Sequence, residues 1–295
     1  MSKHVEWPTL ALLFLTYVIW AAATLWLAEV SLTLAVIVTA LTIAQHSSLQ
    51  HEAMHGHPFR DRRWNTALVF PALTLVIPYL RFRDTHLAHH RDSELTDPYD
   101  DPESNYLDAG VWERLPRAVR WLLNLNNTLA GRMALGPLVG TLNFLISEMR
   151  LARSDPRVLR GWLWHLPMVL PVVVWVAWSP MPFWAYAVGC YLALSLLRIR
   201  TFLEHQAHQQ SRARSVIIED RGPLSFLFLN NNFHVVHHMH PRVPWYRLPG
   251  LYRENAERYR RLNEGYVYPS YREVFRRHFL CRKDPVAHPL WRRGV

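Results

Sequence analysis

The sequence predicts an all-α membrane protein with two transmembrane helical hairpins and a cytoplasmic helical cap that holds a histidine-rich site for two metal ions. Half of the 295 residues are hydrophobic although the net charge is +10, which fits apolar residues gathered into membrane spans. Four apolar runs occur as two close pairs in which Lys and Arg are scarce. The chain also carries 17 histidines, most of them in four short stretches.

The first predicted hairpin lies near the N-terminus. Residues 8–28 and 32–50 are each long enough to cross a bilayer as a helix, and the three residues between them allow only a tight turn. No Lys or Arg occurs between Lys3 and Arg60, so the positive-inside rule places this turn on the far side of the membrane.

The second predicted hairpin comprises residues 162–178 and 182–200, and no Lys or Arg occurs from residue 161 to residue 197. The same rule then places both termini and the polar segments 51–160 and 201–295 in the cytoplasm. We expect residues 1–295 to form a single membrane domain. Cys190 and Cys281 support neither a disulfide framework nor a thiolate metal site.

Three other stretches are expected to lie at or near the membrane surface. Residues 67–80 are apolar but short and contain Pro71 and Pro78, so we expect them to lie in the interface or to re-enter it. Amphipathic patches at 119–125 and 138–146 predict interfacial helices. The chain after Pro249 is rich in Arg and Tyr and is expected to be a solvated cap facing anionic headgroups.

The histidine spacing predicts metal binding. Residues i and i+4 share a helix face, and two imidazoles on one face can bind one ion. The clusters comprise one HxxxH and two HxxHH patterns, and eight histidines are too many for one ion and suit two. A fourth stretch offers His205 or His208 as a further ligand. The clustered histidines are His51, His55, His86, His89, His90, His234, His237 and His238.

Polar groups near the clusters could orient the rings and balance the metal charge by accepting the outer imidazole N–H. Acidic residues are frequent around the second cluster, but the stretch Thr96–Pro102 also has the composition of ordinary turns, and for any one acid that interpretation is favoured. The candidates for such supporting contacts are Glu52, Asp92, Glu204, His208 and Asn231.

The motifs HEAMH at 51–55, HLAHH at 86–90 and HVVHH at 234–238 resemble those of the integral-membrane fatty acid desaturases. These are non-haem di-iron enzymes related to membrane hydroxylases and carotenoid ketolases. The stretches 230–232 (NNN) and 240–246 (HPRVPWY) resemble bacterial members, and the second also resembles the ketolases. The resemblance implies that the eight clustered histidines are ligands and that His205 is the extra one. Thr201 stands where some relatives have asparagine.

The resemblance implies two iron ions and an O2-dependent oxidoreductase that acts on an unactivated C–H of a lipid. Fatty acyl desaturation is the first reading, and hydroxylation or ketolation of a lipid or carotenoid is the alternative. The chain has no CxxC cluster or fused haem domain, so a separate donor such as a ferredoxin would supply electrons. We expect no nucleic-acid partner, and a bacterial inner membrane as the location.

Two other classes of function remain open. His51-Glu52-Ala53-Met54-His55 is an H-E-x-x-H motif, so a membrane zinc protease with Glu52 as general base is possible. That reading leaves both HxxHH clusters unexplained. A metal sensor or transporter without turnover would usually carry its ligands nearer the middle of the membrane.

Overall fold

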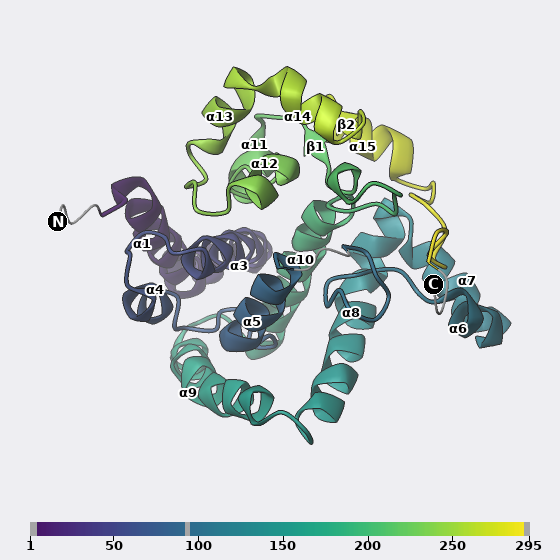
Figure 1. Ribbon diagram of the computed structural model, residues 1–295. Helices are drawn as coiled ribbons and strands as arrows, with labels where there is room; N and C mark the ends of the chain where they lie inside the picture. The colour runs from purple at the N-terminus through teal and green to yellow at the C-terminus, as the bar shows by residue number, and fades with distance from the viewer. Residues whose placement is uncertain (1–4, 92–94, 292–295) are drawn as a thin grey trace. The chain divides into compact units, whose positions relative to one another are not determined.

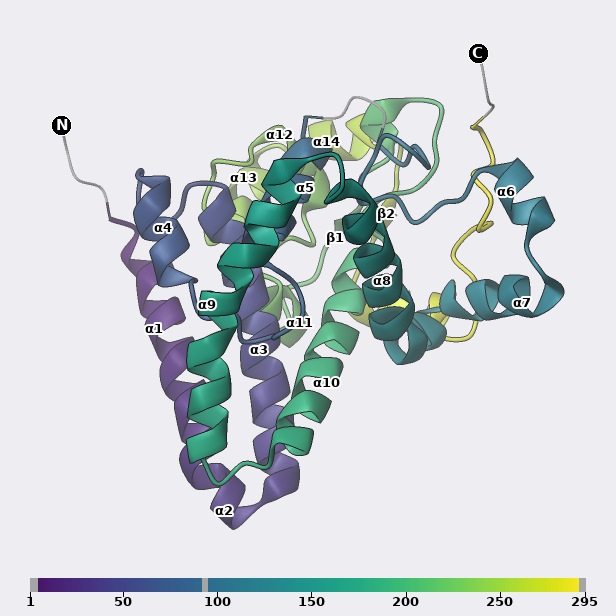
Figure 2. The same cartoon turned by 90° about the horizontal axis from the view of Figure 1, so that it is seen from below.

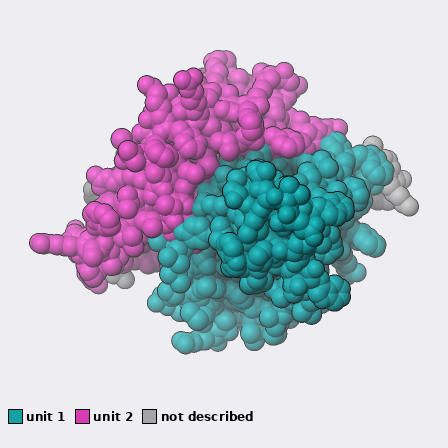
Figure 3. Space-filling model, turned by 180° about the vertical axis from the view of Figure 1, so that it is seen from behind, with its two compact units in different colours: residues 1–84, 138–197, 227–229 teal, residues 85–137, 198–226, 230–295 magenta. Residues whose placement is uncertain are grey.

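The computed structural model describes residues 5–91 and 95–291, and almost all of their regular structure is helical (Figure 1). The predicted all-α class is therefore confirmed. The chain forms two compact units, which Figure 3 colours separately. Unit 1 comprises residues 1–84, 138–197 and 227–229, and unit 2 comprises residues 85–137, 198–226 and 230–295.

Within residues 5–91 and 95–291, four helical stretches are long and apolar enough to cross a membrane. They are Trp7–Val30, Leu32–Met54, Leu129–Leu151 and Pro156–Trp178. The first joins α1 (Trp7–Ala22), a π-helical turn (Ala23–Leu27) and α2 (Ala28–Val30), and the others are α3, α8 and α9. The number of candidate spans agrees with the prediction.

The identity of the spans differs from the prediction in two places. Residues 138–146, expected as an interfacial helix, belong to α8 (Leu129–Leu151), which continues through Pro137 and reaches the length of a span. Helix α10 (Phe183–Thr201), expected as the fourth span, is not among the candidates. Its last turn carries Arg198 and Arg200, which lower its mean hydropathy.

Within unit 1, the two hairpins have their tight turns at the same end (Figure 2). The ring of Trp20 on α1 lies 5.3 Å from that of Trp175 on α9, and Thr24 accepts a 2.9 Å hydrogen bond from the Trp175 indole. Gly189 on α10 faces Thr39 on α3 so closely that a Cβ would lie 3.3 Å from the Thr39 methyl carbon. Small residues thus allow these helices to pack closely.

The segment after α4 (Arg62–Leu68) is irregular and buried within unit 1, as a re-entrant segment would be. Leu73 is fully buried, and its carbonyl accepts a 2.8 Å hydrogen bond from the Tyr186 hydroxyl. The carbonyl of Leu75 accepts one of 3.0 Å from His165, and the N–H of Ala72 donates to Met168. Groups on α9 and α10 therefore form hydrogen bonds with backbone N–H and C=O groups of this segment that are not paired within a helix.

Helix α5 (Tyr79–His89) begins with a buried ion pair in unit 1. Arg81 donates two hydrogen bonds to Glu148 of α8, of 2.6 and 3.0 Å, and both side chains are at least nine-tenths buried. The Trp162 indole donates to the same carboxylate, and a Cβ on Gly161 would lie 2.7 Å from Arg81 Cδ. The pair fixes the start of the helix whose end carries the second histidine cluster.

Unit 2 contains mostly short elements. They are α6 (Ala109–Arg114), α7 (Arg117–Asn126), a 3-10 turn (Ser211–Ala213), β1 (Ile217–Ile218), α11 (Pro223–Leu227), α12 (His234–Met239), α13 (Leu248–Glu254), α14 (Ala256–Leu262), β2 (Val267–Tyr268) and α15 (Tyr271–His278). Strands β1 and β2 are parallel, with Ile217 opposite Val267.

The chain after Pro249 is more than the solvated cap that its composition predicts. Helices α13 and α14 lie beside α12 (Figure 1), and Tyr252 and Tyr259 are buried in one core with Phe233 and Val236. Its arginines remain on the outer face because α13 and α14 are amphipathic. The core fixes α12, which carries the third histidine cluster.

Candidate metal centre

Four histidines of unit 2, His89, His205, His234 and His238, form a group that we call the quartet. One ring nitrogen from each lies within 4.8 Å of the others. The Nε2 atom of His205 is 2.9 Å from that of His89 and 3.0 Å from that of His234, which is 3.1 Å from that of His238. Imidazole–metal bonds are about 2.0–2.1 Å long, so two nitrogens on one ion at a right angle would be about 3 Å apart. The donor set therefore fits one metal ion.

His89, the last residue of α5, is oriented by a carboxylate. Its Nδ1 lies 2.8 Å from Asp101 Oδ1, while its Nε2 faces the quartet. Asp101 is almost fully buried, and it accepts hydrogen bonds from the backbone N–H groups of Thr96 and Glu103. A fixed carboxylate on the outer nitrogen sets the tautomer and raises the basicity of the inner one.

His234 and His238 lie one turn apart on α12, so both point to the same side of that helix. Asn231 Oδ1 is 3.3 Å from His234 Nδ1, and the Asn231 amide donates a 2.7 Å hydrogen bond to Glu204. Glu204 also lies 3.2 Å from Arg200. The expected supporting residues Glu204 and Asn231 thus surround His234.

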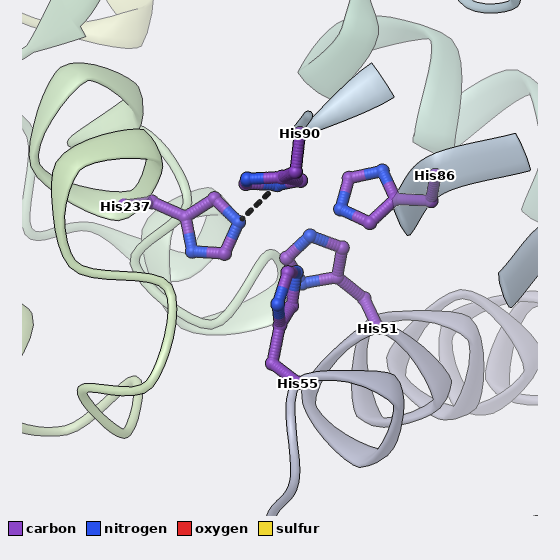
Figure 4. A group of neighbouring side chains, drawn as sticks. All are labelled: His51, His55, His86, His90 and His237. Carbon is purple, nitrogen blue, oxygen red and sulfur yellow. Dashed lines mark hydrogen bonds between the residues drawn. The ribbon is translucent and has the colours of Figure 1, made fainter. Parts of the chain in front are cut away.

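A second group in unit 2, which we call the trio, comprises His86, His90 and His237. Figure 4 shows His86 on α5, His90 directly after the end of that helix and His237 on α12, with a 3.1 Å Nε2–Nε2 contact between His90 and His237. Glu103 Oε1 lies 2.9 Å from His86 Nδ1. The trio adjoins the quartet, because the rings of His90 and His238 stack with centroids 4.2 Å apart. Two neighbouring donor sets suit two neighbouring ions.

The pair His51 and His55 belongs to unit 1 and is also labelled in Figure 4. His51 lies in the last turn of α3 and His55 caps it, and their ring centroids are 4.8 Å apart in an edge-to-face arrangement. Two residues further on, His57 contacts Glu6 at 2.8 Å, which ties the end of α3 to the start of α1. The helix continues far enough to put both imidazoles on one face, as the spacing predicts.

The electrostatics keep four of these imidazoles neutral. Burial and the neighbouring imidazoles lower the pKa values of His205, His234 and His238 well below the usual range, and lower that of His90 to about 3. For His89, burial acts in the same direction, but the contact with Asp101 and the charges of Glu103, Asp101 and Glu204 raise the pKa to about 9. Neutral imidazole is the form that binds metal.

The remaining predicted supporting residues are placed elsewhere or are not described. His208 is not part of the quartet; its Nε2 is 3.5 Å from Glu264 on the outer side of unit 2. Glu52 is buried near the end of α3 in unit 1. Asp92 lies outside the described residues.

Asp101 and Glu103 are the supporting carboxylates that the sequence does not single out. Asp101 is 12 residues after His89 and Glu103 is 17 residues after His86. Asp101 lies in the stretch Thr96–Pro102, whose composition is that of ordinary turns, and Glu103 directly follows it. The one available signal is that this acidic stretch follows directly after a histidine cluster.

Comparison with known proteins agrees with this geometry. The sequence model of the fatty acid desaturase family matches residues 24–270. A β-carotene ketolase of Paracoccus sp. (strain N81106 / MBIC 01143) is 27% identical over 216 residues, which cover 68% of this chain and 71% of the relative. The predicted resemblance is confirmed, and the chain is a membrane oxidoreductase that belongs to the fatty acid desaturase family.

Proposed function

We propose that the protein is an O2-dependent oxidoreductase that uses two iron ions to desaturate a fatty acyl chain at an unactivated C–H position. The observation that carries this proposal is the convergence of four imidazole nitrogens in the quartet beside the three of the trio. Imidazole also suits zinc and copper. Membership of the fatty acid desaturase family supports the choice of iron, because the resemblance to these enzymes implies two iron ions.

In this proposal the quartet holds one ion and the trio holds the other, and the family resemblance implies His51 and His55 as further ligands. When bound, reduced iron supplies the activation of O2 that oxidation of an alkyl chain requires. The chain itself contributes the orientation of the rings, because Asp101, Glu103 and Asn231 contact the outer nitrogens of His89, His86 and His234. The three histidines, Asp101 and Asn231 are buried, which restricts the access of bulk water to them.

The reaction needs two electrons from outside the protein. A CH2–CH2 unit gives up two hydrogens, and O2 takes these with two electrons and two protons to form two molecules of water. We propose that a separate acidic donor such as a ferredoxin supplies the electrons. In support, arginines are exposed along α13–α15 and their connections, at Arg247, Arg253, Arg258, Arg261 and Arg272.

We also propose that the termini and the histidine groups face the cytoplasm of a bacterial cell. The distribution of Lys and Arg supports this orientation. Large apolar side chains such as Phe14, Leu34 and Leu170 are exposed on α1, α3 and α9, as lipid-facing residues are. The substrate would then enter from the bilayer.

Ketolation or hydroxylation of a carotenoid is the second candidate, because a relative is named as a β-carotene ketolase. Hydroxylation inserts one oxygen at a single carbon, and a further oxidation at that carbon gives the ketone. The same imidazole groups would serve this reaction, so the histidines do not distinguish it from desaturation.

Lipid analysis of a host that produces β-carotene tests both candidates. The host expresses the wild-type chain, the ligand variant His234→Ala, or the neighbouring control His240→Ala, together with a ferredoxin system. New double bonds in acyl chains support desaturation, and oxygenated carotenoids support the second candidate. Activity retained in His234→Ala would contradict the ligand assignment.

Metal analysis of the purified protein tests the centre itself. We expect about two iron ions per chain, whereas the H-E-x-x-H protease reading requires about one zinc ion. Iron-loaded protein that forms no product from acyl lipid or β-carotene would contradict the proposed reaction class.

A further inference from the structure

His205 differs from the other members of the quartet in how the backbone holds it. His89 ends α5, and His234 and His238 lie on α12, so helices fix these three. His205 follows the end of α10 at Thr201 and takes part only in an isolated bridge with Ser215. A ligand outside regular structure depends on tertiary contacts for its position.

Residues 214–216 of the same chain contact His205 and the residues on either side of it. The carbonyl of Glu204 accepts a 3.1 Å hydrogen bond from the N–H of Val216, and the N–H of Gln206 donates one of 2.8 Å to Arg214. Ser215 Oγ is 3.2 Å from His205 Nδ1. The carbonyl of His205 itself accepts a hydrogen bond from the ammonium group of Lys283.

Lys283 belongs to the C-terminal segment 279–291, which we call the strap. The Lys283 side chain is 11% exposed, and its backbone N–H donates a 3.1 Å hydrogen bond to the carbonyl of Asn127 at the end of α7. The Asn127 amide donates one of 2.6 Å to the carbonyl of Asp284. The lysine is therefore anchored on both sides of its Cα.

A tyrosine adds a second link between the strap and the His205 segment. The Tyr106 hydroxyl donates to the Asp284 carboxylate and accepts a 2.9 Å hydrogen bond from the N–H of Ala207. The strap also pairs with the loop before α6, where the N–H of Leu107 donates to Val286 and that of His288 donates to Leu107. A segment more than seventy residues away in sequence thus contributes, with residues 214–216, to the position of His205.

The geometry points to Lys283 as a positioning residue that holds the His205 imidazole in the quartet through its backbone carbonyl. This inference rests on the proposed function, in which His205 binds metal. Loss of the ammonium group would free the His205 carbonyl while leaving the helical ligands His89, His234 and His238 in place. The defect would then be confined to the quartet.

The test uses the full chain in detergent, loaded with Fe2+ in the absence of O2. Bound iron is measured per chain, and Mössbauer spectra distinguish the two ions. In Lys283→Met we expect one of the two ions to bind at least about tenfold more weakly and one spectral component to change. The matched control Arg282→Met, whose exposed side chain contacts Asn124, should bind both ions as the wild type does.

Rescue by a conservative variant separates positioning from general damage. Lys283→Arg keeps a charged donor, and a cavity of about 100 Å³ lined by Tyr106, Tyr266, Asp284 and the lysine itself provides room for the larger group. We expect Lys283→Arg to recover most of the lost affinity. If Lys283→Met fails to fold, Lys283→Gln, whose shorter side chain withdraws the donor, should show the same weakened binding.

The outcomes distinguish this inference from the proposed function. If the wild type binds two ions and folded Lys283→Met or Lys283→Gln has the same affinities and spectrum, the positioning role is overturned. If the wild type itself binds fewer than two ions, the proposed di-iron function fails, and the role of Lys283 fails with it.

Discussion

Asp101 receives three hydrogen bonds on its two carboxylate oxygens: the backbone N–H groups of Thr96 and Glu103 and the Nδ1 side of His89. These contacts leave the carboxylate little freedom, so the His89 ring has little freedom either. An imidazole held in this way presents its Nε2 to the quartet without an entropic penalty on metal binding.

Replacement of Asp101 should therefore weaken metal binding without removing a ligand. We expect Asp101→Ala to lower the affinity of one ion by about 10- to 100-fold. Asp101→Asn should lower the affinity by less, because its amide oxygen can still accept a hydrogen bond from the His89 N–H. Iron content after dialysis against a graded chelator measures both changes.

The control is Asp100→Asn, which changes the same charge at the exposed neighbouring position. Its iron content should equal that of the wild type. Equal retention of iron in Asp101→Ala and wild type would contradict the role given to Asp101.

The residues that the sequence could predict are those that repeat a spacing. On a helix, HxxxH and the first and last histidines of HxxHH place two imidazoles on one face, and the structure brings the quartet and the trio together within unit 2. The residues alone left open whether His205 or His208 is the further ligand, because neither has a helical partner, and the family resemblance pointed to His205. His165 lies outside the histidine clusters, and its ring nitrogen pairs with the carbonyl of Leu75, 90 residues away in sequence.

At the scale of elements, the buried irregular segment before α5 depends on side chains from α9 and α10. The Tyr186 hydroxyl donates to the carbonyl of Leu73 and accepts from the Trp20 indole at 3.2 Å. An irregular backbone among apolar helices is tolerated only where such partners exist.

Tyr186→Phe should therefore destabilise unit 1. Two buried polar groups lose a partner, and we expect the free energy of unfolding in detergent to fall by about 1–3 kcal/mol. Cys190→Ser is the matched comparison, because Cys190 Sγ also lies 3.5 Å from the Leu73 carbonyl and serine keeps a donor there. Equal stability of Tyr186→Phe and wild type would contradict this account.

The start of α5 depends on the Arg81–Glu148 pair. Removal of one partner leaves a buried charge, so Arg81→Met or Glu148→Gln should cost about 3–5 kcal/mol of stability. The stability of the double variant Arg81→Met/Glu148→Met should be closer to that of the wild type than the stability of Arg81→Met is, because the double variant leaves neither charge of this pair buried alone. Thermal unfolding in detergent measures all three.

Arg157→Met removes an exposed arginine from its pair with Asp155 and serves as the control, with no measurable change expected. If Arg157→Met lost as much stability as Arg81→Met, burial of the ion pair would not be the cause of the destabilisation.

The sequence predicted the first hairpin well, because length and apolar composition decide a span. The candidate spans include α8 and not α10, whereas the sequence predicted the reverse. The amphipathic patch at 138–146 did not indicate a helix as long as α8. Pro137 interrupts the apolar pattern without ending α8, because the helix continues on both sides of it. Arg198 and Arg200 stand in the last turn of α10, within the range that the sequence assigned to a span.

At the scale of the whole molecule, the charge is distributed unevenly along the chain. Exposed arginines are frequent from α13 to α15, while the apolar candidate spans near the N-terminus contain none. An acidic electron donor would be attracted to such a surface, and salt would weaken the attraction.

Charge reversal on α14 tests this role. Arg258→Glu/Arg261→Glu should slow reduction by an acidic ferredoxin by about tenfold at low ionic strength and by less at high salt. Stopped-flow reduction of the iron-loaded protein measures the rate. The control Arg114→Glu/Arg117→Glu makes the same change in net charge on α6 and α7. An equal decrease in the reduction rate of this control would exclude a specific role for α14.

The loop 95–104 reaches both histidine groups of unit 2, since Asp101 contacts His89 of the quartet and Glu103 contacts His86 of the trio. The two carboxylates are joined through the Glu103 N–H, so their separation along the chain fixes their separation in space. An insertion or deletion between them would misalign both groups at once, whereas a substitution at exposed Asp100 leaves this spacing unchanged. In this loop, evolution can therefore vary composition far more easily than length.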